Sequence, residues 1–203
     1  MQSPYLYHID PRIELIRDFV SADVCQHFVS IGESKLIRSK VMNDEGGSKY
    51  ADARTSQHCW IPLSHDSTVK KVAESICSLV DLPLDNAESF QLVRYHINQE
   101  YKPHYDAFDT DNVAGKEAFK HGGQRLVTAI LYLNEVEEGG NTNFPNLGFE
   151  VEPSLGGLLI FRNCLESGLT RHPKSLHGGM PVLKGEKWIT NLWFRKDKFT
   201  RNS

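Results

Sequence analysis

The sequence lacks the features that mark membrane proteins, disulfide-stabilised proteins and zinc-binding proteins. No apolar run is long enough to cross a bilayer, and the N-terminal residues lack the basic and apolar segments of a secretory signal. The four cysteines show no CxxC or other paired spacing, which argues against a zinc site and against a disulfide framework. These absences predict reduced thiols, a cytoplasmic location and no membrane partner.

The chain also lacks an excess of positive charge. Its net charge is −3 and its isoelectric point is about 6.3, so no nucleic-acid partner is expected. The basic run at residues 195–201 is typical of a solvated surface, and no repeat or low-complexity tract is present. The 203 residues, 39% of them hydrophobic, can bury one substantial core, which predicts a single domain over residues 1–203 and indicates nothing about oligomeric state.

Two amphipathic helices are expected in the first half of the chain. Ser21 has the side chain of an N-cap, and three apolar residues behind it form one stripe, namely Val24, Phe28 and Ile31. A second helix is expected to begin near Asp66 and to end before Pro83, because proline interrupts a helix. Its apolar stripe consists of Val69, Val72, Ile76 and Leu79.

From residue 88 onward, short apolar or alternating runs replace the helical pattern. They cover residues 90–96, 126–133, 158–161 and 188–194, with pairs of glycines between them, as is typical of antiparallel strands. We therefore predict a mainly β fold with flanking helices, a double-stranded β-helix (jelly roll) of cupin-like type. Residues 1–87 are expected to form a helical buttress and substrate-loop region, and residues 88–203 the jelly-roll core.

A candidate metal site begins with His104 and Asp106. In an extended segment, residues two positions apart project from one face, so these side chains are expected to lie together. The distant His177 completes a set of two histidines and one carboxylate, which suits Fe(II) and leaves positions for a cosubstrate and dioxygen. His172 is a rival third ligand, but it lacks the glycines and lysine that follow His177, and His96 is a candidate neighbour of the ligands.

A lysine follows the third ligand at a fixed distance. Lys187 lies ten residues after His177, beyond a turn at Lys184–Gly185. Residues 187–195 are predicted to form a strand whose one face carries Lys187, Ile189, Asn191 and Trp193. If that face lines the cavity that holds the metal, 2-oxoglutarate could bridge the metal and Lys187. Its 2-oxo acid end chelates iron, and its far carboxylate needs a cationic partner.

Three segments combine these residues in one order: 95–106 (YHINQEYKPHYD), 138–145 (EGGNTNFP) and 177–188 (HGGMPVLKGEKW). Together with segment 11–19 (PRIELIRDF) and the Arg54-Thr-Ser56 step, they cover most of the chain, which resembles the prolyl 4-hydroxylase branch of the Fe(II)- and 2-oxoglutarate-dependent dioxygenases. Two positions depart from the pattern of that family. Asn98 replaces a usual glycine, and Met180 replaces a usual cysteine.

The resemblance implies an enzyme that hydroxylates peptidyl proline at the 4-position, with succinate and CO2 as coproducts. Its cofactors would be Fe(II), 2-oxoglutarate, O2 and ascorbate as reductant, and its partner a proline-containing peptide or protein. The implied iron ligands are His104, Asp106 and His177, and the implied cosubstrate-binding residues are Lys187, Tyr95 and Thr142. The implied peptide-groove residues are Arg54, Ser56, Glu88, Tyr101, Arg125 and Trp193.

Two polar segments are expected to be loops. Residues 43–53, rich in glycine, are interpreted as a substrate lid with a hinge at Gly46–Gly47, and residues 109–123 show no sustained period. Two alternatives stay open. The same chemistry could act on a free amino acid, another side chain or a nucleobase, or the chain could be a jelly-roll binding or sensing module without turnover.

Overall fold

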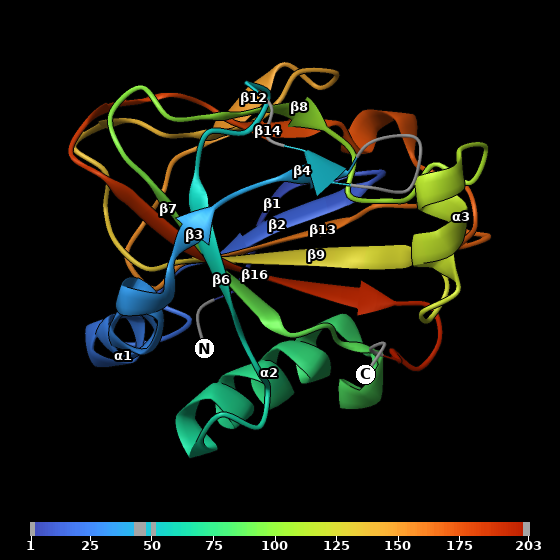
Figure 1. The fold of residues 1–203 in the computed structure, drawn as a ribbon, viewed down its shortest axis with the longest axis horizontal. Coiled ribbons are helices and arrows are strands. Elements are labelled where there is room, and N and C mark those ends of the chain that lie inside the picture. Colours follow the sequence, from blue (N-terminus) through green and yellow to red (C-terminus); the bar gives the residue numbers. More distant parts are fainter. Residues whose placement is uncertain (1–2, 43–47, 50–51, 201–203) are drawn as a thin grey trace.

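The computed structural model describes residues 3–42, 48–49 and 52–200 (Figure 1). Its helices in this part of the chain are α1 (Ala22–Gly32), α2 (Ser67–Val80) and α3 (Val113–Phe119). Three short 3-10 turns accompany them, η1 (Glu33–Lys35), η2 (Leu84–Asn86) and η3 (Pro173–Ser175). None of the helices in these residues is long and apolar enough to cross a membrane.

An antiparallel sheet of eight strands forms the centre of the molecule. In spatial order its strands are β1 (Tyr5–Ile9), β2 (Arg12–Ile16), β13 (Leu158–Arg162), β9 (Arg125–Tyr132), β16 (Lys187–Arg195), β7 (Phe90–Tyr95), β6 (Gln57–Ile61) and β3 (Ile37–Arg38). The four strands expected from residue 88 onward are all present, and β9 and β16 lie side by side in the middle.

A smaller antiparallel sheet lies across one face of the large one. Its spatial order is β12 (Phe149–Val151), β11 (Thr142–Phe144), β14 (His177–Gly179) and β8 (Tyr101–His104). Two strand pairs complete the fold, β10 (Glu138–Gly139) with β15 (Val182–Lys184), and β4 (Val41–Met42) with β5 (Ser48–Lys49). In Figure 1, β8, β12 and β14 lie above the large sheet, and α1 and α2 lie below it. The expected jelly roll is confirmed.

The middle strands of the large sheet are buried on both faces, and strand periodicity sorts their side chains. On β9, Val127 and Leu131 belong to the core that packs on α1 and α2, whereas Ile130 and Tyr132 belong to the core between the two sheets. Successive side chains of a strand project to opposite faces, so one strand supplies both cores. The face toward the small sheet is the face that carries the cavity described below.

Both predicted helices begin where their caps indicated. The Ser21 hydroxyl accepts a hydrogen bond from the amide of Val24, and the Asp66 carboxylate accepts bonds from the amides of Thr68 and Val69. The second helix ends at Val80, one residue before a left-handed cap at Asp81. The predicted end of its apolar stripe was wrong: Val80 is buried, whereas the preceding Leu79 is 37% exposed.

The expected division at residue 87 differs from the structure. Strands β1, β2, β3 and β6 come from residues before 88 and join the large sheet, so the jelly roll draws on both parts of the chain. The five-residue segment Arg12–Ile16 alternates too briefly for its sequence to predict a strand by itself; β2 exists because it pairs with β13.

The two predicted loops have different outcomes. Most of the proposed lid, including Gly46–Gly47, lies outside the described residues. The segment 109–123 contains helix α3, which begins after Asn112, whose side-chain oxygen accepts a hydrogen bond from the amide of Gly115. A helix of seven residues offers too few turns for a hydrophobic period to be recognised in the sequence.

Candidate active site

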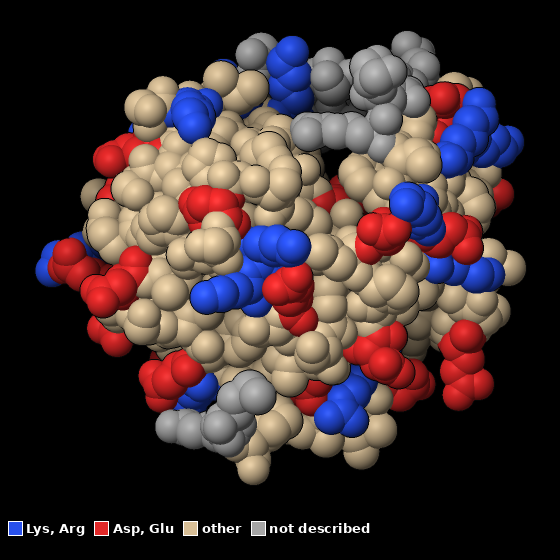
Figure 2. Space-filling model, turned by 90° about the horizontal axis from the view of Figure 1, so that it is seen from below, with Lys and Arg blue, Asp and Glu red and all other residues tan. Residues whose placement is uncertain are grey.

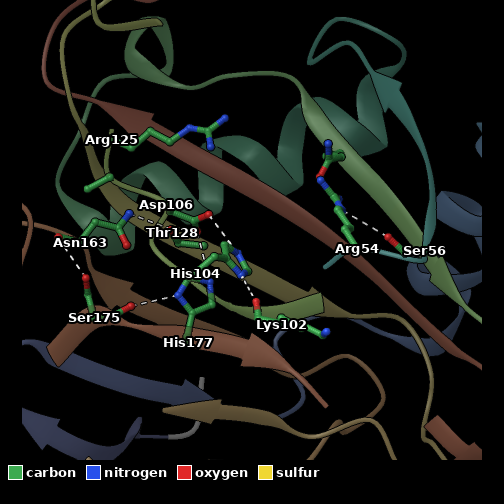
Figure 3. Close-up of polar contacts among 12 residues, drawn as sticks. Arg54, Ser56, Lys102, His104, Asp106, Arg125, Thr128, Asn163, Ser175 and His177 are labelled. Carbon is green, nitrogen blue, oxygen red and sulfur yellow. Dashed lines mark hydrogen bonds and ion pairs between the residues drawn. The ribbon is translucent and has the colours of Figure 1, made fainter. Parts of the chain in front are cut away.

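Two paired strands and the loop after one of them bring three potential metal ligands together (Figure 3). His104 ends β8 and pairs in register with His177, the first residue of β14, and Asp106 follows two residues after β8. The Nε2 atoms of His104 and His177 lie 3.7 Å and 3.5 Å from the two carboxylate oxygens of Asp106. One donor atom from each residue lies within 4.8 Å of the others, so a single ion could bind all three.

The backbone orients both imidazole rings. Nδ1 of His104 lies 2.9 Å from the carbonyl oxygen of Lys102, and Nδ1 of His177 lies 3.0 Å from that of Ser175. Because a carbonyl oxygen only accepts, each Nδ1 must carry the proton, and each Nε2 turns a lone pair toward Asp106. Burial, together with the neighbouring His177, lowers the pKa of His104 to about 3, so this ring is neutral at physiological pH.

A chain of side chains holds the carboxylate. Thr128 Oγ1 donates a hydrogen bond of 2.7 Å to Asp106, and Asn163 Nδ2 donates one of 2.8 Å to Thr128. Burial raises the pKa of Asp106, but the neighbouring His177 and His104 rings, the Arg125 guanidinium and the Thr128 hydrogen bond outweigh it and hold the pKa below its usual range. A carboxylate and a neutral imidazole are the forms that bind metal, and two nitrogens with one oxygen suit Fe(II).

The other two candidate histidines lie elsewhere. His172 is buried, with its Nε2 3.2 Å from a carboxylate oxygen of Asp10, and its Nδ1 accepts a hydrogen bond from the Lys174 amide at the start of η3. His96 is half-exposed and its Nδ1 lies 3.9 Å from the Glu186 carboxylate. Neither belongs to the cluster around Asp106, and the groups that orient the ligands are instead backbone carbonyls and Thr128.

Lys187 is a buried cation in the same cavity as the cluster. Its side chain is 2% exposed, its Nζ donates a 2.6 Å hydrogen bond to the Gly140 carbonyl, and it lies 5.6 Å and 5.7 Å from the ring centres of Tyr95 and Tyr132. Burial lowers the pKa of Lys187 to about 7. No carboxylate pairs with it among the described residues, so an anionic ligand would supply the missing charge.

The two other expected cosubstrate residues lie in the same cavity as this ammonium. Tyr95 pairs in register with Lys187 across β7 and β16, and Thr142 hydrogen-bonds to the Tyr132 hydroxyl at 2.8 Å. Tyr95 and Thr142 both line the cavity. Tyr132 and Gly140 were not predicted from the sequence; Tyr132 lies on the same face of β9 as Thr128, whose role the structure alone shows.

The cavity has a volume of about 390 Å³ and is open to solvent on one side. All four residues expected on one face of residues 187–195 line it: Lys187, Ile189, Asn191 and Trp193. Four of the six expected groove residues also line it, namely Arg54, Tyr101, Arg125 and Trp193. The guanidinium of Arg54 lies 4.7 Å from the ring centre of Tyr101. The guanidinium of Arg125 lies 3.9 Å from the ring centre of Trp193.

The remaining two expected groove residues, Ser56 and Glu88, do not line the cavity. Ser56 lies behind the wall, where its hydroxyl accepts a hydrogen bond from Arg54 Nε. Glu88 is buried and accepts two bonds from Arg125, at 2.7 Å and 2.8 Å, and one from Arg195 at 2.6 Å. Its pKa is lowered because the two guanidinium groups outweigh the effect of burial. Both residues therefore contact arginines, and their assignment to the peptide groove stays a prediction.

The departure at Asn98 is accommodated by its backbone. Asn98 has a φ of 63°, in the left-handed region that glycine usually occupies and that asparagine tolerates better than most residues. The replacement therefore preserves the turn between β7 and β8.

Comparisons with known proteins agree with this geometry. The family model described as the 2OG-Fe(II) oxygenase superfamily matches residues 90–195. A putative prolyl 4-hydroxylase of Acanthamoeba polyphaga mimivirus is 39% identical over 92% of this chain and 75% of its own length. Prolyl 4-hydroxylase 5 of Arabidopsis thaliana is 33% identical over 94% of this chain and 70% of its own length.

Solved structures show the same fold. A viral collagen prolyl hydroxylase from Paramecium Bursaria Chlorella virus-1, in a 2OG complex, matches with a TM-score of 0.72 and 27% identity, covering 90% of this chain and 95% of that one. A Pseudomonas putida prolyl-4-hydroxylase matches in fold with a TM-score of 0.62 at 20% identity, over 90% and 91% of the two chains. The chain therefore belongs to the prolyl 4-hydroxylase family of Fe(II)- and 2-oxoglutarate-dependent dioxygenases.

Proposed function

We propose that this protein hydroxylates peptidyl proline at the 4-position and converts 2-oxoglutarate to succinate and CO2. The names of its relatives support proline as the target, because the relatives in Acanthamoeba polyphaga mimivirus and in Arabidopsis thaliana are both named as prolyl 4-hydroxylases. The observation that carries the proposal is the content of one cavity. It contains the His104, Asp106 and His177 cluster, the buried Lys187 and an aromatic wall.

In this proposal the cluster holds Fe(II), and Lys187 pairs with the far carboxylate of 2-oxoglutarate. When bound, the iron centre supplies the oxidation, in which one oxygen atom of O2 enters succinate and the other becomes the hydroxyl group. The chain's residues orient the ligands and exclude water. Tyr95 and Thr142 line the cavity beside Lys187 and are assigned to the cosubstrate.

The aromatic wall is suited to an apolar ring next to the metal. The ring of Tyr101 stacks on that of His104 with 3.5 Å between their centres, and the Arg54 guanidinium lies 4.7 Å from the centre of the Tyr101 ring. Trp193, held by Arg125, lies on the same cavity wall. Grooves lined by aromatic side chains bind proline-rich peptides, because the pyrrolidine ring packs on them and the extended backbone is already ordered.

Three further properties belong to the proposal. Ascorbate would restore the iron after turnovers uncoupled from substrate. A cytoplasmic location agrees with the four cysteines, which are all free thiols. A peptide rather than a nucleic acid is favoured by the net charge of −3. On the side of α1 and α2, which Figure 2 shows, Lys and Arg are interspersed with Asp and Glu.

The test is turnover of 2-oxoglutarate with proline-containing peptides, followed by mass spectrometry. We expect succinate release that is stimulated by peptide, with one added oxygen atom on proline. His177→Ala should abolish it, whereas the matched control His172→Ala should retain substantial turnover, because His172 lies outside the cluster. Stimulation by a free amino acid or an oligonucleotide, but not by peptide, would contradict the proline assignment. Full turnover of His177→Ala would contradict the ligand assignment.

A further inference from the structure

A directed chain of hydrogen bonds runs from Arg54 to His58 behind the cavity wall. Arg54 Nε donates to Ser56 Oγ at 3.3 Å, and Ser56 Oγ donates to Ser39 Oγ at 3.0 Å. Ser39 Oγ in turn lies 3.0 Å from Nδ1 of His58. An arginine side chain can only donate, and each serine has one hydroxyl proton to give. The hydroxyl proton of Ser39 is then left for His58, and in this arrangement Nδ1 of His58 accepts it.

This arrangement corresponds to one tautomer of the imidazole. A ring that accepts at Nδ1 is neutral and carries its single proton on Nε2. Burial, together with the nearby charge of Arg54, lowers the pKa of His58 to about 4, so the ring stays neutral at physiological pH. Ser39 and Ser56 are both completely buried, which protects the chain from exchange with water. His58 thus presents one N–H group on the side of the ring away from Ser39.

His58 lies on the cavity wall but far from the metal cluster. It lines the cavity on β6, on the same strand face as Trp60, whose ring centre is 6.0 Å away, and Trp60 is tilted against Trp193 at 6.2 Å. In the large sheet, β6 lies three strands from β9, whose Thr128 holds Asp106. Three strand spacings are about 14 Å, so His58 stands outside the group of metal ligands.

We infer that His58 is a substrate-positioning residue whose Nε2–H donates a hydrogen bond to a backbone carbonyl of the bound peptide. This inference rests on the proposed function. Proline has no backbone N–H, and a polyproline-type segment makes no internal hydrogen bonds, so carbonyl oxygens are the regular polar groups of such a peptide. No hydrogen-bond acceptor for Nε2 is present among the residues that the structure describes. Trp60 beside it supplies an apolar surface for the proline ring.

The first experiment measures the state of the ring. Long-range proton–nitrogen NMR of the full-length protein between pH 6 and pH 8 should show His58 with its proton on Nε2 and an unprotonated Nδ1. Ser39→Ala removes the hydroxyl that specifies this tautomer, so the spectrum of this variant should show a mixture. A protonated Nδ1 in the unmodified protein would overturn the inference.

The second experiment measures peptide use by His58→Phe, which keeps an aromatic ring and removes the donor. We expect the KM for a proline peptide to rise about 5- to 30-fold, the loss expected for one hydrogen bond, with little change in kcat. His58→Gln, which restores an N–H group, should recover part of the loss. The matched control is His65→Phe at an exposed histidine outside the cavity, which should keep both constants.

A set of peptides identifies the acceptor. In each peptide one backbone carbonyl is replaced by a thiocarbonyl, which is a weaker acceptor. For the unmodified protein, kcat/KM should fall most when the thiocarbonyl is at one particular position. His58→Phe should show no further loss at that position. If His58 had a purely structural role, the dependence of kcat/KM on thiocarbonyl position would be the same in both proteins. An unchanged KM or an identical thiocarbonyl profile in His58→Phe would overturn the inference alone. Failure of the unmodified protein to hydroxylate any proline peptide would overturn the proposed function and the inference with it.

Discussion

Lys187 is a charged side chain at a position where charge is energetically unfavourable. It is almost fully buried between two tyrosine rings, and a backbone carbonyl is its hydrogen-bond partner. Its folded pKa of about 7 lies below the ordinary value of 10.5. Between these two values the unfolded chain binds more protons at this site than the folded one, so the contribution of Lys187 to the free energy of unfolding rises with pH.

The same shift predicts how 2-oxoglutarate binding depends on pH. Above a pH of about 7 the free protein holds Lys187 neutral, and a dianion must bring the proton back when it binds. The affinity should therefore fall with rising pH, by up to about tenfold per pH unit. The test is a calorimetric titration of the protein with 2-oxoglutarate at pH 8, with Mn(II) present, in buffers of different ionisation enthalpy. It should record the uptake of about one proton for each 2-oxoglutarate bound.

Lys187→Arg is the matched control. Arginine keeps its proton at this pH, so this variant should take up no proton when 2-oxoglutarate binds. Lys187→Ala should weaken binding about 30- to 5,000-fold, the range for truncating one partner of a buried charge pair. Unchanged 2-oxoglutarate binding in Lys187→Ala would move the anchor to another cation. Arg125, which lines the cavity, is the next candidate, whereas Arg162 is exposed and does not line it.

At the scale of elements, the spacing of β8 and β14 sets the spacing of the histidine ligands. His104 and His177 are cross-strand partners, so any change in the separation of the two strands changes the distance between the two Nε2 atoms. Gly178 lies in the middle of this arrangement. A Cβ there would meet the Tyr101 carbonyl oxygen and the Pro103 nitrogen at 3.0 Å each, both of them backbone atoms.

Gly178→Ala should therefore weaken metal binding without removing a ligand. Backbone atoms on β8 cannot swing aside as a side-chain end can, so the strands must separate by some tenths of an ångström. Fe(II) or Mn(II) affinity, measured by anaerobic titration, should fall about tenfold or more, as expected for loss of support around a metal site. Gly179→Ala is the control, since its nearest contact, at 3.8 Å, is ordinary; equal affinities for the two variants would contradict this account.

At the scale of the whole molecule, the site lies on one face of a sheet whose other face packs on helices. One core joins α1 and α2 to the large sheet, and the other fills the space between the sheets. The ligands line a cavity rather than either core, so the fold does not depend on the metal for its apolar contacts. Ligand binding should nevertheless stabilise the native state by mass action.

Thermal unfolding tests this separation of fold and site. Mn(II) with 2-oxoglutarate at about 100 times the Kd should raise the Tm by about 5–10 °C in a chain of this size. His104→Ala and Asp106→Ala should unfold cooperatively without ligand and show little or none of this increase. His96→Ala should show all of it, because His96 lies outside the cluster. A ligand variant that fails to fold would show that the cluster is structural.

The sequence alone determined the features that depend on neighbours along the chain. The caps at Ser21 and Asp66, the strands at residues 90–96 and 187–195 and the single face shared by Lys187 and Trp193 all follow from local periodicity and side-chain chemistry. The order and spacing of the motifs also predicted the family, whose iron and 2-oxoglutarate chemistry the comparisons support.

Only the tertiary structure decided which distant residues meet. Glu88 and Arg195 are 107 positions apart, and no local pattern could show that they pair. The strands before residue 88 likewise exist because partners later in the chain complete their hydrogen bonds. The tautomer of His58 depends on Ser39, Ser56 and Arg54 meeting behind one wall. Burial and pairing are properties of the packed molecule, because they depend on strands that the fold alone brings side by side.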